Sequence, residues 1–97
     1  MKILPKPVVF EWDKGNVDKN FIRHGVTNKE AEEVFNNEPP LLSEDVKHST
    51  IERRFQALGK TNNDRLLFVS FTIRNDRVRV ISARDMNKKE VKVYEKV

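Results

Sequence analysis

The sequence contains no cysteine, only three glycines, and no long uninterrupted hydrophobic run. Without cysteine the chain forms neither disulfides nor thiolate metal sites, and it has no cysteine nucleophile. With glycine only at positions 15, 25 and 59, it also has no glycine-rich phosphate loop. We recognise neither a signal peptide nor the roughly 20 apolar residues of a membrane span, and we therefore expect a cytoplasmic protein without a membrane partner.

Charged residues, in contrast, are plentiful and unevenly distributed. Lys, Arg, Asp and Glu make up 35% of the 97 residues, and the net charge is +4. Residues 1–50 carry 7 basic and 9 acidic side chains, whereas residues 51–97 carry 12 basic and 6 acidic ones. This basic half favours a polyanionic partner such as RNA, although solvated strand and helix faces would give the same composition. The length fits a single domain over residues 1–97.

The pattern of apolar residues predicts an α+β fold with a mostly antiparallel sheet. Strands are expected at residues 8–12, 41–45, 51–58, 65–74 and 77–83, and helices at 16–24, after Thr27, and at 87–94. Thr27 and Glu30 form a capping box for the second helix. The first helix would place Val17, Phe21 and His24 on one face.

A two-residue hairpin loop at Asn75 and Asp76 would fix the register of the last two strands. The resulting cross-strand pairs are Arg74 with Arg77, Thr72 with Arg79, Ser70 with Ile81, and Phe71 with Val80. One face is then the expected core, and its residues are Leu67, Val69, Phe71, Ile73, Val78 and Val80. The other face is open to solvent or to a ligand.

The strand before this hairpin has two possible registers. A loop of two or four residues would bury Glu52 and Arg54, whereas a loop of three residues would bury Phe55 and Ala57 instead. Burying the charged pair carries a desolvation penalty, while burying Phe55 contributes about 1.5–3 kcal/mol. We therefore expect a single patch of sheet to carry Glu52, Arg54, Thr72, Arg74 and Arg79.

This patch has the side chains that RNA cleavage without a metal requires. The reaction needs a base for the 2′-hydroxyl, cations for the phosphorane and an acid for the 5′-oxygen. Glu52 would be the base, and arginine forks match phosphate oxygens. An exposed ladder of cross-strand ion pairs is the structural alternative.

His24 is the remaining candidate for proton transfer. Histidine titrates near physiological pH, which suits this task. Its position in the last helical turn before Gly25, however, favours a structural role, either stabilising the helix C-terminus or packing. His48 falls in an expected loop, and Asp45 with His48 provides too few ligands for a metal site.

Three blocks of sequence together resemble the BrnT toxins of bacterial BrnT–BrnA toxin–antitoxin pairs. The first block contains Phe10-Glu11-Trp12-Asp13, Lys19-Asn20 and Arg23-His24-Gly25-Val26. The second contains Asp45, His48-Ser49, Glu52, Arg54 and Gly59. The third contains Arg74, Arg79-Val80-Ile81-Ser82-Ala83-Arg84, Glu90 and Tyr94. The resemblance extends over nearly the whole chain, and the order and spacing of the three blocks argue against a chance match.

The resemblance implies a fold, an activity and partners. The implied fold is RelE-like, a compact antiparallel sheet with two N-terminal helices and a short C-terminal helix. The implied activity is metal-independent RNA cleavage that stops translation, without a cofactor. The implied partner is a BrnA-like ribbon-helix-helix antitoxin, through which alone the chain would meet DNA. A non-catalytic RNA- or antitoxin-binding module of the same fold, or a purely structural partner of a repressor, remains the alternative.

The resemblance also assigns residues. The implied catalytic residues are His24, Glu52, Arg54, Arg74 and Arg79, and basic residues assigned to RNA binding are Lys19, Arg23, Arg77 and Arg84. Two positions depart from the family's pattern, because Arg23 and Asn16 stand where lysine is usual. Simple strand alternation places Arg84 on the face opposite Arg79, which favours a structural role for it.

Overall fold

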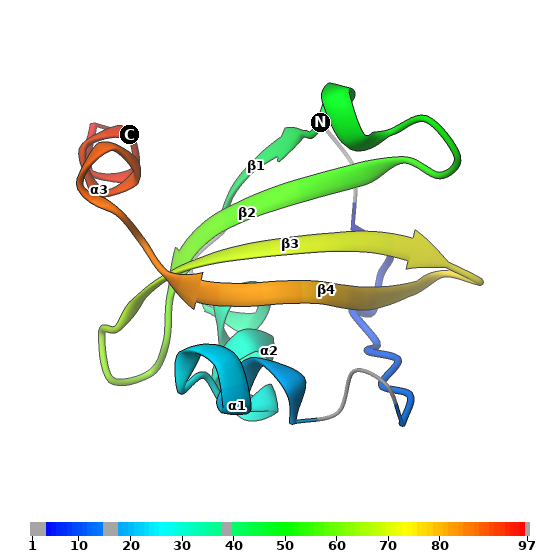
Figure 1. The fold of residues 1–97 in the computed structure, drawn as a ribbon, viewed down its shortest axis with the longest axis horizontal. Coiled ribbons are helices and arrows are strands. Elements are labelled where there is room, and N and C mark those ends of the chain that lie inside the picture. The colour runs from blue at the N-terminus through cyan, green and yellow to red at the C-terminus, as the bar shows by residue number, and fades with distance from the viewer. Residues whose placement is uncertain (1–3, 15–17, 38–39, 97) are drawn as a thin grey trace.

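The computed structural model describes residues 4–14, 18–37 and 40–96, which form a four-stranded sheet with helices on both sides (Figure 1). The helices are α1 (Lys19–His24), α2 (Asn28–Asn36) and α3 (Lys88–Glu95), with a 3-10 turn η1 (Val46–His48). The strands are β1 (Leu41–Glu44), β2 (Arg54–Lys60), β3 (Leu66–Arg74) and β4 (Arg77–Asp85), paired antiparallel in that order. The α+β prediction is confirmed, and the RelE-like label stays a prediction. No helix in these ranges is long and apolar enough to span a membrane.

Helix α2 packs on one face of the sheet and closes the core. Its predicted capping box is present, with Glu30 N donating to Thr27 Oγ1 at 3.1 Å and Thr27 N donating to Glu30 Oε1 at 3.0 Å. The buried side of α2 carries Ala31, Val34 and Phe35, and the Phe35 ring meets Phe71 of β3 edge-on at 5.0 Å. The core thus includes the predicted strand residues Leu67, Val69, Phe71, Val78 and Val80, with Ile73 partly buried beside them.

The predicted hairpin between β3 and β4 is confirmed. Asn75 and Asp76 have φ values of 51° and 59°, as the two-residue turn that suits twisted strands requires. Arg74 pairs with Arg77, and Thr72 pairs with Arg79. We call the sheet face opposite α2 the outer face; it is defined by Arg54, Phe68, Thr72, Arg74, Arg77 and Arg79.

The preferred register of β2 is also confirmed. Phe55 lies opposite Phe71 and is only 5% exposed, while Arg54 lies opposite Thr72 on the outer face. Lys60 pairs with Leu66, so the intervening loop, residues 61–65, is longer than the expected three residues but has the same odd parity. An odd loop sends the same set of side chains to the core.

A β-bulge in β4 corrects two predictions. Ser70 pairs with Ser82 rather than Ile81, because the register shifts by one residue between Ser70 and Phe71. Beyond the extra residue Ile81 the alternation of β4 reverses, and Ala83 rather than Ser82 is buried. Arg84 therefore lies on the outer face, not on the opposite one as simple alternation predicts.

The expected first strand is wrong in its extent. Within residues 8–12 only Phe10 forms a bridge, parallel to Val78, with Val78 N donating to Val9 O at 2.7 Å and Glu11 N donating to Val78 O at 2.9 Å. The physical reason lies at the edge of β4. Helix α1 occupies that edge after Val80, where Ala83 N donates to Asn20 Oδ1 and Lys19 Nζ donates to Ile81 O.

The predicted face of α1 is wrong as well. Phe21 is 56% exposed and His24 is exposed, whereas Asn20 is only 2% exposed. The short helix lies against a strand edge with free backbone groups, so an amide that satisfies them is buried in place of an aromatic ring. Asn16 and Val17, at the expected start of this helix, lie outside the described residues.

Candidate functional site

A row of polar side chains crosses the outer face from strand to strand. Arg54 of β2 lies opposite Thr72 of β3, which lies opposite Arg79 of β4. Neighbouring strands are about 4.8 Å apart, so these three residues are immediate neighbours. Thr72 is only 2% exposed, and its hydroxyl donates to Arg53 O at 2.7 Å, which ties the start of β2 to the middle of β3.

Glu52 joins this row through Arg74. The two side chains form a forked ion pair, with Arg74 Nε at 3.1 Å from Glu52 Oε2 and Arg74 Nη2 at 3.3 Å from Oε1. Glu52 precedes β2 and reaches the outer face from the loop, while Arg74 ends β3. The hydrogen bonds to Glu52, followed by its charge, raise the pKa of Arg74. The structure thus brings Glu52, Arg54, Arg74 and Arg79 to one surface, as the register predicts.

Two carboxylates on this surface were missed by sequence reasoning. Arg79 Nη1 donates to Glu11 Oε1 at 3.0 Å, and Arg79 Nη2 is paired with Asp13. Both acids come from the extended segment beside β4, where residues two apart point to the same side. The signal was present in that alternation, but nothing in the sequence says which strand edge this segment joins.

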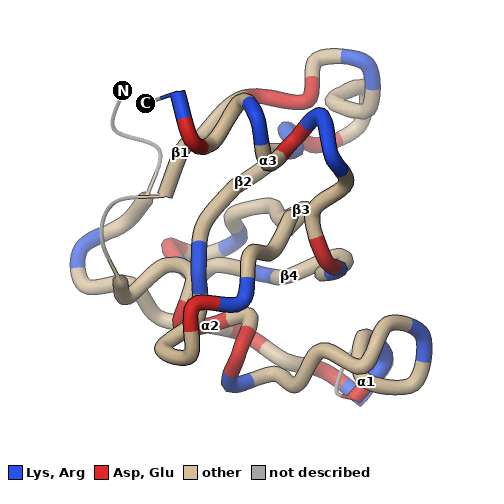
Figure 2. Tube along the Cα trace, turned by 90° about the vertical axis from the view of Figure 1, so that its left-hand side faces the viewer, with Lys and Arg blue, Asp and Glu red and all other residues tan. Residues whose placement is uncertain are grey.

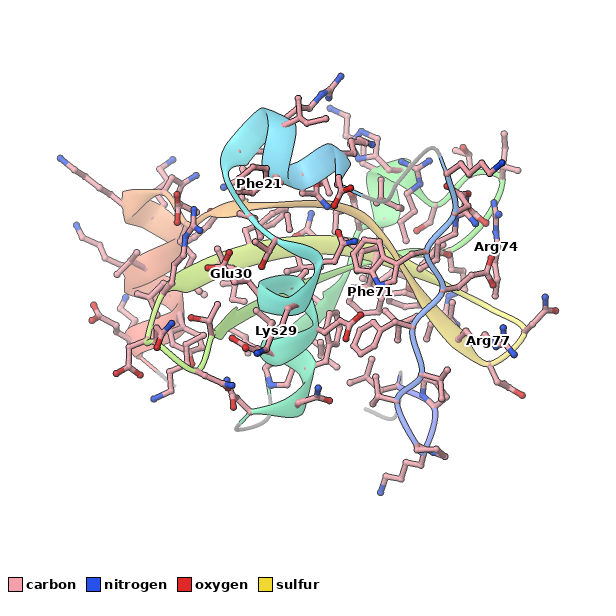
Figure 3. All side chains as sticks on the ribbon, turned by 90° about the horizontal axis from the view of Figure 1, so that it is seen from below. Phe21, Lys29, Glu30, Phe71, Arg74 and Arg77 are labelled. Atoms are coloured by element: carbon pink, nitrogen blue, oxygen red, sulfur yellow. The ribbon has the colours of Figure 1, made fainter. Side chains whose placement is uncertain are left out.

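These acids change the charge of the expected basic face. The three carboxylates of Glu11, Asp13 and Glu52 more than offset the two positive charges of Arg74 and Arg79. Acidic and basic residues are interspersed along the trace (Figure 2). Arg54 and Arg77 differ, since neither guanidinium has an ion-pair partner among residues 4–14, 18–37 and 40–96. Figure 3 shows Arg74 and Arg77 together at the hairpin end of the sheet.

A second polar group lies at the β1 end of the same row. His48 Nδ1 is 2.9 Å from Asp45 Oδ2, and the His48 side chain is 58% exposed while that of Asp45 is 15% exposed. Burial of the Asp45 carboxyl raises its pKa, but the hydrogen bonds from His48 outweigh this effect and hold the pKa below its usual value. In the sequence, the spacing of Asp45 and His48 indicated only a metal site with too few ligands.

His24 is not brought to this surface. Its carbonyl accepts from Arg65 Nη2 at 3.4 Å, and Arg65 is paired with Asp85 at the far end of β4. Six residues separate Arg79 from Asp85 along the strand, a distance of roughly 20 Å. His24 therefore lies at the opposite end of the sheet from Glu52 and the arginines.

The residues assigned to RNA binding are also dispersed. Lys19 donates to the bulge carbonyl of Ile81 at 3.1 Å, and Arg23 is exposed on α1. Arg84 forms a forked ion pair with Glu90 of α3, at 2.8 and 2.9 Å, and its guanidinium lies 4.2 Å from the centre of the Phe68 ring. Arg84 therefore anchors α3 to the outer face. Only Arg77 lies near the charged row.

An apolar cavity of about 360 Å³ lies beside the Arg84–Glu90 ion pair, between α3 and the outer face of β1, β2 and β3. Its walls include Leu41, Leu58, Phe68 and Val93. In the described part of the chain, no three His, Asp or Glu side chains converge as a metal site requires.

A family model described as the ribonuclease toxin BrnT of type II toxin–antitoxin systems matches residues 12–90, most of the chain. No curated protein sequence matches this chain. The matched range contains Asp13 and every residue of the row across the outer face, from Asp45 to Arg79.

Proposed function

The chain belongs to the BrnT family of ribonuclease toxins of type II toxin–antitoxin systems, and from this premise we propose that its outer face cleaves RNA without a metal ion. The observation that carries the proposal is the grouping of Glu52 with Arg54, Arg74 and Arg79 on one surface. Among the catalytic residues that the family resemblance implies, His24 is left out, because it lies at the other end of the sheet.

Each retained residue has a chemical role. Glu52 takes the proton from the 2′-hydroxyl that attacks phosphorus, and Arg74 orients the carboxylate through its forked hydrogen bonds. Arg54 binds the phosphate, because its fork has no carboxylate partner among the described residues. Arg79, fixed by Glu11 and Asp13, directs its remaining N–H groups toward the charge that develops on the phosphorane.

The biological consequence follows from the family. Cleaving RNA in the cytoplasm would stop translation, and a cognate antitoxin must neutralise the enzyme. We infer that this antitoxin is BrnA-like, with a ribbon-helix-helix DNA-binding part, and that one toxin domain over residues 1–97 binds it. Co-expression of the chain with the product of its neighbouring reading frame tests this. A stable complex with a ribbon-helix-helix protein is expected, and a partner of another fold would contradict it.

Purified protein, RNA and a chelator test the enzymatic proposal. Cleavage should persist in excess EDTA and leave 2′,3′-cyclic phosphate ends, because the 2′-oxygen is the nucleophile. Expression in a bacterial host should arrest growth and degrade RNA. Binding to RNA without cleavage would contradict the proposal and favour a non-catalytic module. Cleavage that stops in EDTA and returns with a divalent ion would contradict metal independence alone.

A further inference from the structure

The geometry points to His48, held by Asp45, as the general acid that protonates the leaving 5′-oxygen of the RNA. This inference rests on the proposed ribonuclease function and adds the group that the row of Glu52 and arginines lacks. Arginine does not release a proton at physiological pH, and Glu52 is assigned as the base. The reaction therefore needs a second titratable side chain on the outer face.

The Asp45–His48 pair has the geometry of an oriented imidazole. The 2.9 Å contact joins Asp45 Oδ2 to Nδ1, which leaves Nε2 as the nitrogen available to a substrate. The Asp45 side chain is 15% exposed and the imidazole 58% exposed, so a partly buried carboxylate holds the ring while the ring stays accessible. A carboxylate on one ring nitrogen fixes the orientation of the imidazole and directs the other nitrogen toward a substrate.

The pair stands in line with the catalytic row. Asp45 N donates to Arg54 O at 2.8 Å, which extends the β1–β2 ladder by one residue past Glu44 and Phe55. Asp45 is thus the neighbour of Arg54 on the same side of the sheet, followed by Thr72 and Arg79. With strands about 4.8 Å apart, the whole row spans about 15 Å, and the side chains that reach over it can meet one phosphodiester.

The loop that carries His48 is anchored at both ends. Ser49 Oγ donates to Asp45 O at 2.6 Å and accepts from Arg54 N at 3.0 Å. Asp45 also accepts from His48 N through its side chain at 3.3 Å, which caps η1. The same loop carries Glu52 four residues later and lies beyond the ends of β1 and β2, away from α1 and α2 (Figure 1). One short segment therefore presents both the acid and the base.

The proposed step balances. Glu52 accepts the proton of the 2′-hydroxyl as the bond from the 2′-oxygen to phosphorus forms. The bond from phosphorus to the 5′-oxygen breaks, and the imidazolium of His48 gives its Nε2 proton to that oxygen. The products are a 2′,3′-cyclic phosphate and a free 5′-hydroxyl, and the enzyme is left with neutral His48 and protonated Glu52.

A leaving group that needs no proton tests this role. We would measure single-turnover cleavage of an RNA with one scissile linkage and of the same RNA with sulfur in place of the bridging 5′-oxygen. His48→Ala and His48→Gln should cleave the oxygen linkage about 10²- to 10³-fold more slowly than wild type. Both should cleave the sulfur linkage within about tenfold of the wild-type rate, because a thiolate leaves unprotonated.

Controls separate this inference from folding and from the proposed function. Thr50→Ala, an exposed position in the same loop, should match wild type on both substrates. Asp45→Asn should slow the oxygen linkage more than the sulfur linkage with an unchanged KM, as expected of a positioning residue. His48 variants that are folded and slow on both linkages, or fast on the oxygen linkage, would overturn the inference while leaving the ribonuclease proposal intact. A wild type that cleaves neither linkage would overturn both.

Discussion

Arg54 and Arg77 are the two outer-face arginines without an ion-pair partner among the described residues, yet they occupy different places. Arg54 stands in the row between Asp45 and Thr72, whereas Arg77 follows the hairpin turn. Arg54→Ala should lower kcat by about 10²- to 10³-fold, since it removes a donor that binds the reacting phosphate. Arg77→Ala should raise KM severalfold with little change in kcat.

Steady-state kinetics on a short RNA distinguish the two variants. Neither side chain supports a described ion pair, so both proteins should keep the wild-type thermal midpoint. Equal effects on kcat and KM in both variants would mean that Arg54 contributes only electrostatic attraction.

Arg65 provides a prediction about stability and pH. It bridges Glu30 at 3.2 Å and Asp85 at 2.7 Å, and it donates to Gly25 O at 2.9 Å. The Arg65 hydrogen bond lowers the pKa of Asp85 from 3.8, and the Thr27 backbone bond together with Arg65 lowers that of Glu30 from 4.5. A carboxyl group whose pKa is lower in the folded than in the unfolded state stabilises the fold at pH values above its unfolded-state pKa. This stabilisation is lost as the pH falls through the folded-state pKa.

Arg65→Ala should therefore reduce the free energy of unfolding by about 1–2 kcal/mol at pH 7. The difference between wild type and variant should shrink below pH 4, where the two carboxyls become protonated. Urea denaturation from pH 7 to pH 3 measures this, and a difference that stays constant over that range would contradict the linkage.

Single-residue roles were only partly predictable from the sequence. The grouping of Glu52 with three arginines followed from alternation and from the high free energy of burying charge. The carboxylates of Glu11 and Asp13 did not, because their partner Arg79 is 66 to 68 residues away. His24 was assigned from the family's motif, and a motif carries no information on which end of the sheet its helix joins.

At the scale of elements, Gly59 decides how closely α2 approaches β2. A Cβ at Gly59 would lie 2.8 Å from Val34 Cγ1 and 3.4 Å from Pro40 Cβ. Val34 is fully buried, and its β-branched side chain has few rotamers available in a helix. Gly59→Ala should therefore destabilise the protein by about 1–3 kcal/mol. This corresponds to a fall in the thermal midpoint of at least about 4 °C for a chain of this size.

Differential scanning calorimetry of Gly59→Ala checks this expectation. Gly25→Ala is the matched comparison, because nothing lies within 4 Å of a Cβ there and its φ of +67° produces backbone strain alone. Wild-type stability of Gly59→Ala would contradict the close contact between α2 and β2.

Elements themselves were predicted well where local chemistry specifies them. The capping box at Thr27 and the Asn75–Asp76 turn are as expected. The bulge at Ile81 was not predicted, because the alternation on either side of it is regular. Its carbonyl is satisfied by Lys19, a residue 62 positions away, so no local pattern specifies it.

At the scale of the whole molecule, the excess of positive charge in residues 51–97 does not form an unopposed basic face. Residues 11 and 13 bring acidic side chains from the N-terminal half onto the outer face. For single-stranded nucleic acid, the slope of log binding constant against log salt concentration is about −0.7 for each phosphate that the protein neutralises. If only Arg54 and Arg77 neutralise phosphates, the slope should be about −1.4.

Fluorescence anisotropy with a cleavage-resistant 2′-deoxy or 2′-O-methyl oligonucleotide over a range of salt concentrations measures this slope. A value near −2.8, expected if Arg74 and Arg79 also release their carboxylates to bind phosphate, would contradict persistence of these ion pairs in the complex. Charge counts predicted an anionic partner, but the magnitude of the attraction depends on the tertiary pairing.

The most direct test of the central claim, that the outer face cleaves RNA through Glu52 and its neighbouring arginines, is the single-turnover cleavage rate of Glu52→Gln in EDTA. Glutamine keeps the size of the side chain and a hydrogen-bond acceptor for Arg74, and Glu52 is only partly buried, so the fold should be retained. The account predicts a rate at least about 100-fold below wild type, with unchanged thermal midpoint and antitoxin binding. A folded Glu52→Gln protein that cleaves RNA at the wild-type rate would contradict it.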